Sequence, residues 1–175
     1  MNAWLSTSTT YGTRLPGDVR GFVSNVRVEQ GPRTRHNIPG TLCDADIPTL
    51  EATARQKMKG AAVRLTQPQA AVLSQQFQET ASFRNWRLLA MAIMCNHVHV
   101  VLAANESIGG AELLKDLKSY GSRKLSERFG RPQGGTWWTS SGSKRHLPDQ
   151  RAIDSAIEYV MNQQYPLFVW RSDNL

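Results

Sequence analysis

Two apolar runs separated by a two-residue break constrain this chain more than any other feature of its sequence. The first run is RLLAMAIM at residues 87–94, and the second is HVHVVLA at residues 97–103. Two apolar runs joined by so short a break are typical of a hairpin between central strands. The sequence therefore predicts a β-sheet with this hairpin near its middle.

Weaker patterns on both sides of the hairpin predict the remaining elements. A Thr- and aromatic-rich start indicates a strand, a capping box at residues 66–69 opens a helix, and leucines at helical spacing follow the glycine pair at 109–110. The expected elements are a strand at 3–11, helices at 67–82 and 111–129, a strand near 143–147, and a helix from about 148 to about 164. This order predicts an α+β fold, a ferredoxin-like or RRM-like antiparallel sheet with helices packed on one side.

Length and composition favour one domain. A chain of 175 residues with 40% hydrophobic content can bury one core but divides poorly into two. We therefore expect a single domain over 1–175, with an irregular insertion at about 18–60. That insertion contains one short helix near 50–59 and could drape over a bound partner.

The net charge and the cysteine content limit the binding partners and the cellular compartment that we expect. The formal net charge is +7, which favours polyanionic partners without choosing among them. The two cysteines form no CxxC pair, and we find no secretory signal and no apolar run long enough for a membrane span. We expect a cytoplasmic protein with neither a disulfide scaffold nor a membrane partner.

The second apolar run carries two histidines. Residues alternate between the faces of a strand, so His97 and His99 project to one side and Val98 and Val100 to the other. An isolated pair of this kind is commonly just polar surface. In a central strand, however, two imidazoles are costly unless they lie in a cleft or bind something. This favours half of a metal site.

The last predicted helix offers a third ligand. Its apolar stripe fixes how the helix rotates against the sheet; the stripe consists of Ile153, Ala156, Ile157 and Val160. At about 100° per residue, Tyr159 lies roughly 110° and Gln163 roughly 70° from the centre of the stripe, on the same flank, whereas Asn162 points away. Gln163 is therefore preferred to Asn162. Taken alone, a tyrosine in the position of Tyr159 is more often a half-buried aromatic at the helix margin, and the alternative for Gln163 is a solvated amide.

Three segments resemble one known family. The stretch NHVHVV at 96–101 resembles the HUH signature, histidine-hydrophobe-histidine, of single-tyrosine transposases, which include insertion-sequence and REP-associated tyrosine transposases. Residues 9–18, TTYGTRLPGD, resemble the opening of some members, and residues 156–163, AIEYVMNQ, resemble their nucleophile helix. Gln163 stands where REP-associated members carry asparagine followed by proline, which is similar to the insertion-sequence branch. Cys95 stands where proline is common.

The resemblance implies a metal-dependent single-stranded DNA endonuclease and strand transferase. Tyr159 would be the nucleophile, leaving a 5′-phosphotyrosine and a free 3′-hydroxyl, and His97, His99 and Gln163 would bind Mg²⁺ or Mn²⁺. The implied partner is single-stranded or hairpin DNA, with the protein on the nucleoid when bound. A homodimer is also implied by some relatives, although REP-associated members can act as monomers.

Basic residues and one aromatic are candidate DNA contacts. Their alternative roles are a solvated face for the basic residues and core packing for the tryptophan. The candidates are Lys115, Lys118, Arg123 and Lys124, then Arg14 and Arg145, with Trp138 as a base-stacking residue.

Three other functions remain open on the sequence. The first is a domesticated hairpin-DNA-binding protein that does not cleave. The second is an RRM-like RNA-binding module, although residues 97–101 are not an aromatic RNA-binding strand. The third is a zinc-dependent hydrolase, although no HExxH helix is present.

Overall fold

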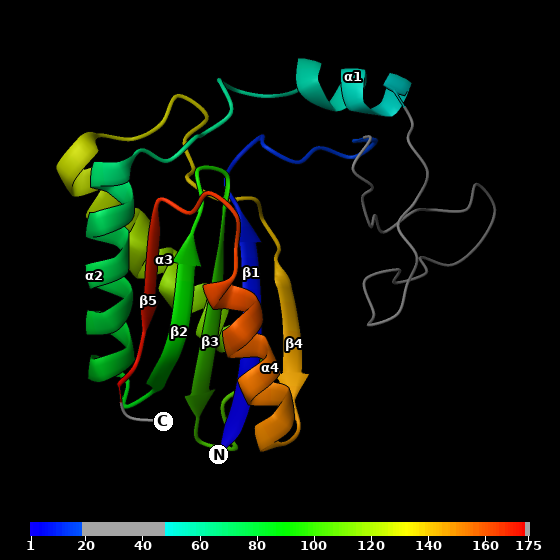
Figure 1. Ribbon diagram of the computed structural model, residues 1–175. Coiled ribbons are helices and arrows are strands. Elements are labelled where there is room, and N and C mark those ends of the chain that lie inside the picture. The colour runs from blue at the N-terminus through cyan, green and yellow to red at the C-terminus, as the bar shows by residue number, and fades with distance from the viewer. Residues whose placement is uncertain (19–47, 174–175) are drawn as a thin grey trace.

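The computed structural model describes residues 1–18 and 48–173 (Figure 1). Of the predicted insertion at 18–60, residues 19–47 lie outside the described residues, and the short helix expected near 50–59 is present. The elements are β1 (Asn2–Thr9), α1 (Pro48–Gln56), α2 (Gln67–Phe83), β2 (Arg87–Ile93), β3 (His97–Ala104), α3 (Gly110–Phe129), β4 (Ser143–Leu147), α4 (Gln150–Met161) and β5 (Phe168–Arg171).

The strands form one antiparallel sheet in the order β4-β1-β3-β2-β5. The predicted hairpin is β2 and β3, and β3 lies in the middle with β1 on its other side. The predicted α+β class and antiparallel sheet are confirmed. Strand β5 was not predicted; its four residues pair with Ala90–Ile93 of β2 at one edge.

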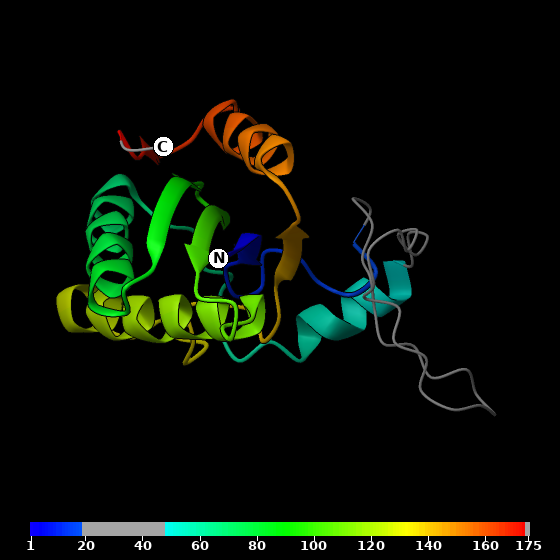
Figure 2. The ribbon, with the colours of Figure 1, turned by 90° about the horizontal axis from the view of Figure 1, so that it is seen from below.

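Helices cover both faces of the sheet, as Figure 2 shows. Helices α2 and α3 pack on one face, where Phe77 and Leu117 meet Val100 of β3. Helix α4 packs on the other face, where Ile157 meets Val101 of the same strand. The prediction that the helices pack on one side therefore holds for α2 and α3 but is wrong for α4. The reason is that β2 and β3 are apolar on both faces, so each face needs a cover.

Local sequence fixes how α2 and α4 begin. The backbone N–H of Thr66 donates to the Gln69 side chain at 2.9 Å, as the capping-box prediction requires. Asp149 caps α4 by accepting a hydrogen bond from the Ala152 N–H at 2.8 Å. The predicted stripe on α4 then buries Ala156, Ile157 and Val160.

Three connections meet at the end of the sheet where β2 turns into β3. The N–H of Thr10 donates to the Asn96 carbonyl at 2.9 Å, that of Leu65 to the Cys95 carbonyl at 2.6 Å, and that of Leu167 to the Ile93 carbonyl at 2.8 Å. The segments after β1, before α2 and after α4 are thereby tied to one hairpin turn. Functional side chains from different parts of the chain can meet at this end.

In the part of the chain that is described, none of the helices has both the length and the apolar character needed to cross a bilayer.

Candidate active site

The central hairpin holds the two histidines on the face that α4 covers. In the register of the sheet, His99 lies opposite Thr7 of β1 and Ala92 of β2. The His97 and His99 ring centroids are 4.7 Å apart, with the rings nearly perpendicular at 83°. The predicted shared face is therefore observed, and the two imidazoles are neighbours.

Each imidazole is oriented through its Nδ1 atom. The Asn96 side-chain oxygen lies 2.7 Å from Nδ1 of His97 and can only accept, so this Nδ1 carries the proton. The Thr7 hydroxyl lies 2.7 Å from Nδ1 of His99 and can accept in the same way. With the proton on Nδ1, the lone pair is on Nε2, the arrangement in which a histidine binds a metal ion.

His99 is kept neutral by its surroundings. It is only 6% exposed. Burial, which disfavours the charged imidazole, and then the neighbouring His97 lower the pKa of His99 from 6.5 to about 4. At neutral pH this side chain is therefore an uncharged nitrogen donor.

This lowered pKa predicts a loss of stability in weak acid. Below its ordinary pKa of 6.5, His99 takes up a proton in the unfolded chain but resists it in the folded chain down to about pH 4. The free energy of unfolding should therefore fall by about 3 kcal/mol from this group as the pH drops from 6.5 to 4. Urea unfolding in EDTA should show a steeper loss over this range for the wild type than for His99→Gln. Equal losses would contradict the prediction.

Helix α4 brings Tyr159 to the histidines. Its ring centroid lies 5.3 Å from that of His99, at an interplanar angle of 78°. The side chain is 50% exposed, so the phenol is in contact with His99 and with solvent at once. A ligand arriving from solvent can therefore reach the tyrosine and the histidine pair together.

Gln163 follows the end of α4 instead of lying within it. The helix was expected to continue to about residue 164, but it ends at Met161, with Asn162 as its C-cap. The Gln163 amide nitrogen donates to the Tyr159 carbonyl at 2.9 Å. This carbonyl is one of those that a helix end leaves without an intrahelical donor, so the bond both caps the helix and anchors the amide. The oxygen of that amide is the type of atom that a hard divalent cation binds.

The donor set fits a metal ion with nitrogen and oxygen ligands. Among residues 1–18 and 48–173, no third His, Cys, Asp or Glu joins the pair in a metal-type cluster. The Gln163 amide nitrogen is held by the Tyr159 carbonyl at the end of α4, and its role as the third ligand stays a prediction. Asn162 instead lines a hollow on the other flank of α4, together with Asp154 and Arg171.

The predicted DNA contacts are divided between the two faces. Helix α3 covers the face opposite α4, so its basic residues are separated from Tyr159 by the sheet. Among them, Lys124 pairs with Glu127, and the Arg123 guanidinium lies over the Tyr120 ring. The α3 residues in this group are Lys115, Lys118, Arg123 and Lys124.

Two other predicted contacts lie outside α3. Arg14 follows the Thr10 turn, which is tied to Asn96 beside His97. Arg145 pairs in register with Leu5, which packs in the cluster that α4 covers, so it belongs to the Tyr159 face. Both arginines are exposed. Their roles as DNA contacts stay predictions.

Trp138 is not the exposed stacking platform that was expected. Its side chain is 4% exposed and packs in the core beneath α2 and α3, as does that of Trp137. The adjacent residues both close the core because the segment crosses from α3 to β4 over apolar surface. Stacking of a base on the face of this ring is therefore disfavoured.

The sequence patterns missed Thr7 and passed over Asn96 as a ligand-orienting residue. Thr7 is 92 positions from His99, and only the β1–β3 register brings them together. Asn96 directly precedes His97, so its contact could have been suspected from adjacency alone.

Comparison with known proteins adds to this geometry. The family model described as "Transposase IS200 like" matches residues 57–163, which is more than half of the chain. The match includes both histidines, Tyr159 and Gln163. No protein of curated function matches the sequence.

Two solved structures are similar. One is a REP-associated tyrosine transposase bound to a REP hairpin, at 9% identity and a TM-score of 0.52, with 91% of this chain covered. This chain spans 64% of the length of that protein. The other is a candidate transposase from Deinococcus radiodurans R1, at 15% identity and a TM-score of 0.47, covering 94% of this chain and 93% of that one. The first likeness shows a shared fold, and on the strength of the family match this chain belongs to the IS200-like transposase family.

Proposed function

We propose that this chain is a metal-dependent single-stranded DNA endonuclease and strand transferase that acts through a 5′-phosphotyrosine on Tyr159. The observation that carries the proposal is the three-ring cluster on one face of the sheet. His97 and His99 lie 4.7 Å apart, and the half-exposed Tyr159 ring lies 5.3 Å from His99. The chain belongs to a transposase family, and transposases cut and join DNA. We therefore assign DNA cleavage and joining to this cluster.

His97, His99 and Gln163 are the residues that would hold the metal ion. Both histidines are oriented through Nδ1, and the Gln163 amide is held by its nitrogen. When bound, a divalent cation such as Mg²⁺ or Mn²⁺ supplies positive charge that polarises the scissile phosphate. The hydrogen bonds that Thr7 and Asn96 accept from the two Nδ1 atoms limit how far either imidazole can rotate.

Tyr159 would perform the covalent step. Its phenolic oxygen forms a bond to the scissile phosphorus, the bond from phosphorus to the 3′-oxygen breaks, the phenol loses its proton and the leaving oxygen gains one. The products are a 5′-phosphotyrosine and a free 3′-hydroxyl. Because the phosphodiester energy is conserved in the tyrosine link, a second 3′-hydroxyl can reverse the attack and be joined without ATP.

The position of Tyr159 favours single-stranded substrate. The ring lies against His99 at the boundary between α4 and the sheet, so a phosphate must approach from the solvent side alone. One strand can bend into such a site more readily than a duplex. A hairpin flank is a natural source of single strand, and the similar REP-associated transposase was solved with a hairpin.

A covalent-capture experiment tests the function. Wild-type protein is incubated with single-stranded hairpin DNAs from the flanks of its own gene, in Mn²⁺, Mg²⁺ or EDTA, and resolved on denaturing protein gels. A label at the 3′ end should move with the protein, whereas a label at the 5′ end should appear on a shorter free strand. The reverse pattern would contradict the proposed polarity. DNA that binds but never becomes linked, with every metal and flank, would favour a binding protein without cleavage.

Thr7→Val should weaken metal binding without unfolding the chain. Valine matches threonine in shape but cannot accept a hydrogen bond from Nδ1 of His99. Loss of such an outer-shell partner costs about 10–100-fold in metal affinity. The measurement is the Mn²⁺ concentration that gives half-maximal adduct. Thr7→Ser, which keeps the hydroxyl, is the matched control, and equal metal dependence in both variants would contradict the predicted role.

A further inference from the structure

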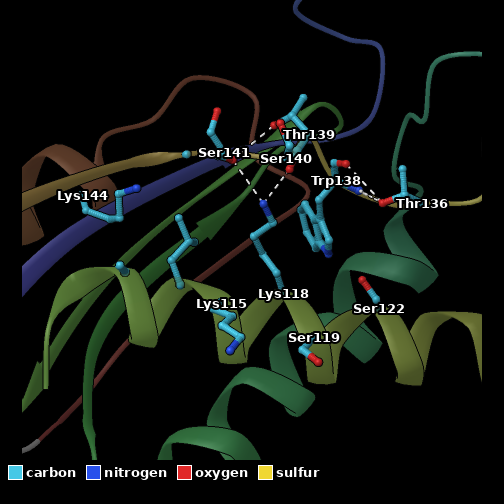
Figure 3. A pocket seen from close by; sticks show the side chains of 13 residues that line it. Lys115, Lys118, Ser119, Ser122, Thr136, Trp138, Thr139, Ser140, Ser141 and Lys144 are labelled. Atoms are coloured by element: carbon cyan, nitrogen blue, oxygen red, sulfur yellow. Dashed lines mark hydrogen bonds between the residues drawn. The ribbon is translucent and has the colours of Figure 1, made fainter. Parts of the chain in front are cut away.

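On the face opposite Tyr159, α3 and the 136–144 segment line an open pocket of about 390 Å³. Figure 3 shows Lys118 rising from α3 to the 139–141 loop and the Trp138 indole pointing down towards α3. This volume lies within the range of about 300–1,000 Å³ that is common for ligand pockets. The pocket is distinct from the histidine site, since the sheet separates them.

The charged residues that line the pocket are all positive. Among the described residues that line it, three are lysines, namely Lys115, Lys118 and Lys144, and none is acidic. In the described part of the chain no ion pair engages any of the three. Burial and the nearby Lys144 lower the pKa of Lys118, so these two ammonium groups repel each other. An anion between them would relieve that repulsion.

Two polar groups of the pocket can donate more hydrogen bonds than they make within the protein. Nζ of Lys118 donates to the Thr139 carbonyl at 2.6 Å and to the Ser141 carbonyl at 3.1 Å, and an ammonium group has three protons to donate. The Trp138 indole N–H is buried without an acceptor. The indoles of Trp4 and Trp86 are also unpaired but do not line this pocket. A side chain that lines the pocket, Trp138, therefore has a buried N–H without an acceptor.

The rest of the lining suits a nucleoside. Leu114, Ala111 and the Trp138 ring provide apolar surface, and serine and threonine hydroxyls surround it. Hydroxyls both donate and accept, as the edges of nucleobases and sugars require. Cations at one end and a mixed apolar and hydroxyl surface at the other match a phosphate joined to a base.

We infer that this pocket binds a single nucleoside phosphate, with the phosphate between Lys118 and Lys144 and the base near Trp138. Two sources share this chemistry: a free mononucleotide, and one unpaired nucleotide of a bound DNA strand. Only the second source rests on the proposed function. The histidine site takes no part in either.

The test reads the Trp138 indole N–H directly. In ¹⁵N-labelled Tyr159→Phe protein, which cannot link to DNA, the indole resonance is assigned through Trp138→Phe and followed during addition of thymidine 5′-monophosphate, thymidine or a short oligothymidylate. A saturable shift with a phosphate-bearing probe, absent with thymidine, is expected. Lys144→Gln should weaken that binding about tenfold, since a bond to a charged group is removed. Lys57→Gln, at an exposed lysine that lies outside the pocket and is not among the predicted DNA contacts, should leave the affinity unchanged.

Each outcome decides the inference. A shift with the mononucleotide supports a free nucleotide as the source, and a shift with the oligonucleotide alone supports a DNA strand. No shift with either probe up to millimolar concentration, or a shift that Lys144→Gln leaves intact, overturns the inference. Because Lys144→Gln does not alter the Lys118 contacts with the 139–141 loop, it tests binding and not loop anchoring. Wild-type adduct formation is measured separately, so a failed pocket and a failed nuclease are distinguishable.

Discussion

Tyr159→Phe should abolish the covalent DNA adduct while leaving the fold and DNA binding unchanged. The substitution removes only the phenolic oxygen, the atom proposed to attack phosphorus. Loss of the nucleophile in a covalent mechanism costs on the order of 10⁶-fold in rate, which places the remaining adduct below detection. Since the side chain is half exposed, the loss of its hydroxyl should not change the free energy of unfolding appreciably. The measurement is the labelled band on a denaturing gel.

Tyr165 provides a matched control for that variant. It is six positions further along the chain and 92% exposed, so Tyr165→Phe makes the same chemical change outside the three-ring cluster. This variant should form adduct at the wild-type rate. If the adduct survived in Tyr159→Phe and disappeared in Tyr165→Phe, the nucleophile would have been assigned to the wrong tyrosine.

His97→Ala should reduce adduct formation by about 100-fold or more at a fixed metal concentration. Removing an outer-shell partner already costs about 10–100-fold in metal affinity, and removing a ligand should cost at least as much. DNA binding measured without metal should persist, because most of its affinity comes from phosphate contacts. The measurement is a titration of adduct against Mn²⁺. The matched control is His146→Ala, since His146 is exposed on β4 with its ring against Trp4, away from the cluster.

The same titration can distinguish Gln163 from Asn162 as the third metal ligand. Gln163→Ala should shift the Mn²⁺ dependence to higher concentration, whereas Asn162→Ala should not, because Asn162 lines the hollow on the other flank of α4. A shift with Asn162→Ala alone would reassign the ligand. The roles of His97, His99, Gln163 and Tyr159 stay predictions until these variants are measured.

Periodic sequence patterns predicted most of the framework. The apolar runs at 87–94 and 97–103 became β2 and β3, and the capping box at 66–69 opened α2. Such signals are local, since each depends on residues a few positions apart. Strand β5 gave no such signal, because four residues at a sheet edge are too short for a period to stand out and its partner β2 lies far back in the chain.

The end of α4 shows where a local pattern fails. The apolar stripe continued the helical period, so the helix was expected to reach about residue 164. It ends at Met161 because the chain must turn back to pair β5 with β2, and the N–H of Leu167 then donates to the Ile93 carbonyl. Gln163 still lies beside Tyr159, but through a side-chain hydrogen bond and not through helix geometry.

The sequence by itself determined that His97 and His99 share a face, because alternation along a strand is a property of the backbone. It also determined that α4 docks through a stripe containing Ile157 and Val160. Only the tertiary structure decided that α4 covers the histidine face while α3 and its lysines cover the other, and that Thr7 orients His99. The physical reason is that β2 and β3 are apolar on both faces, so local pattern cannot choose which helix covers which. That choice depends on how the whole chain buries both faces at once.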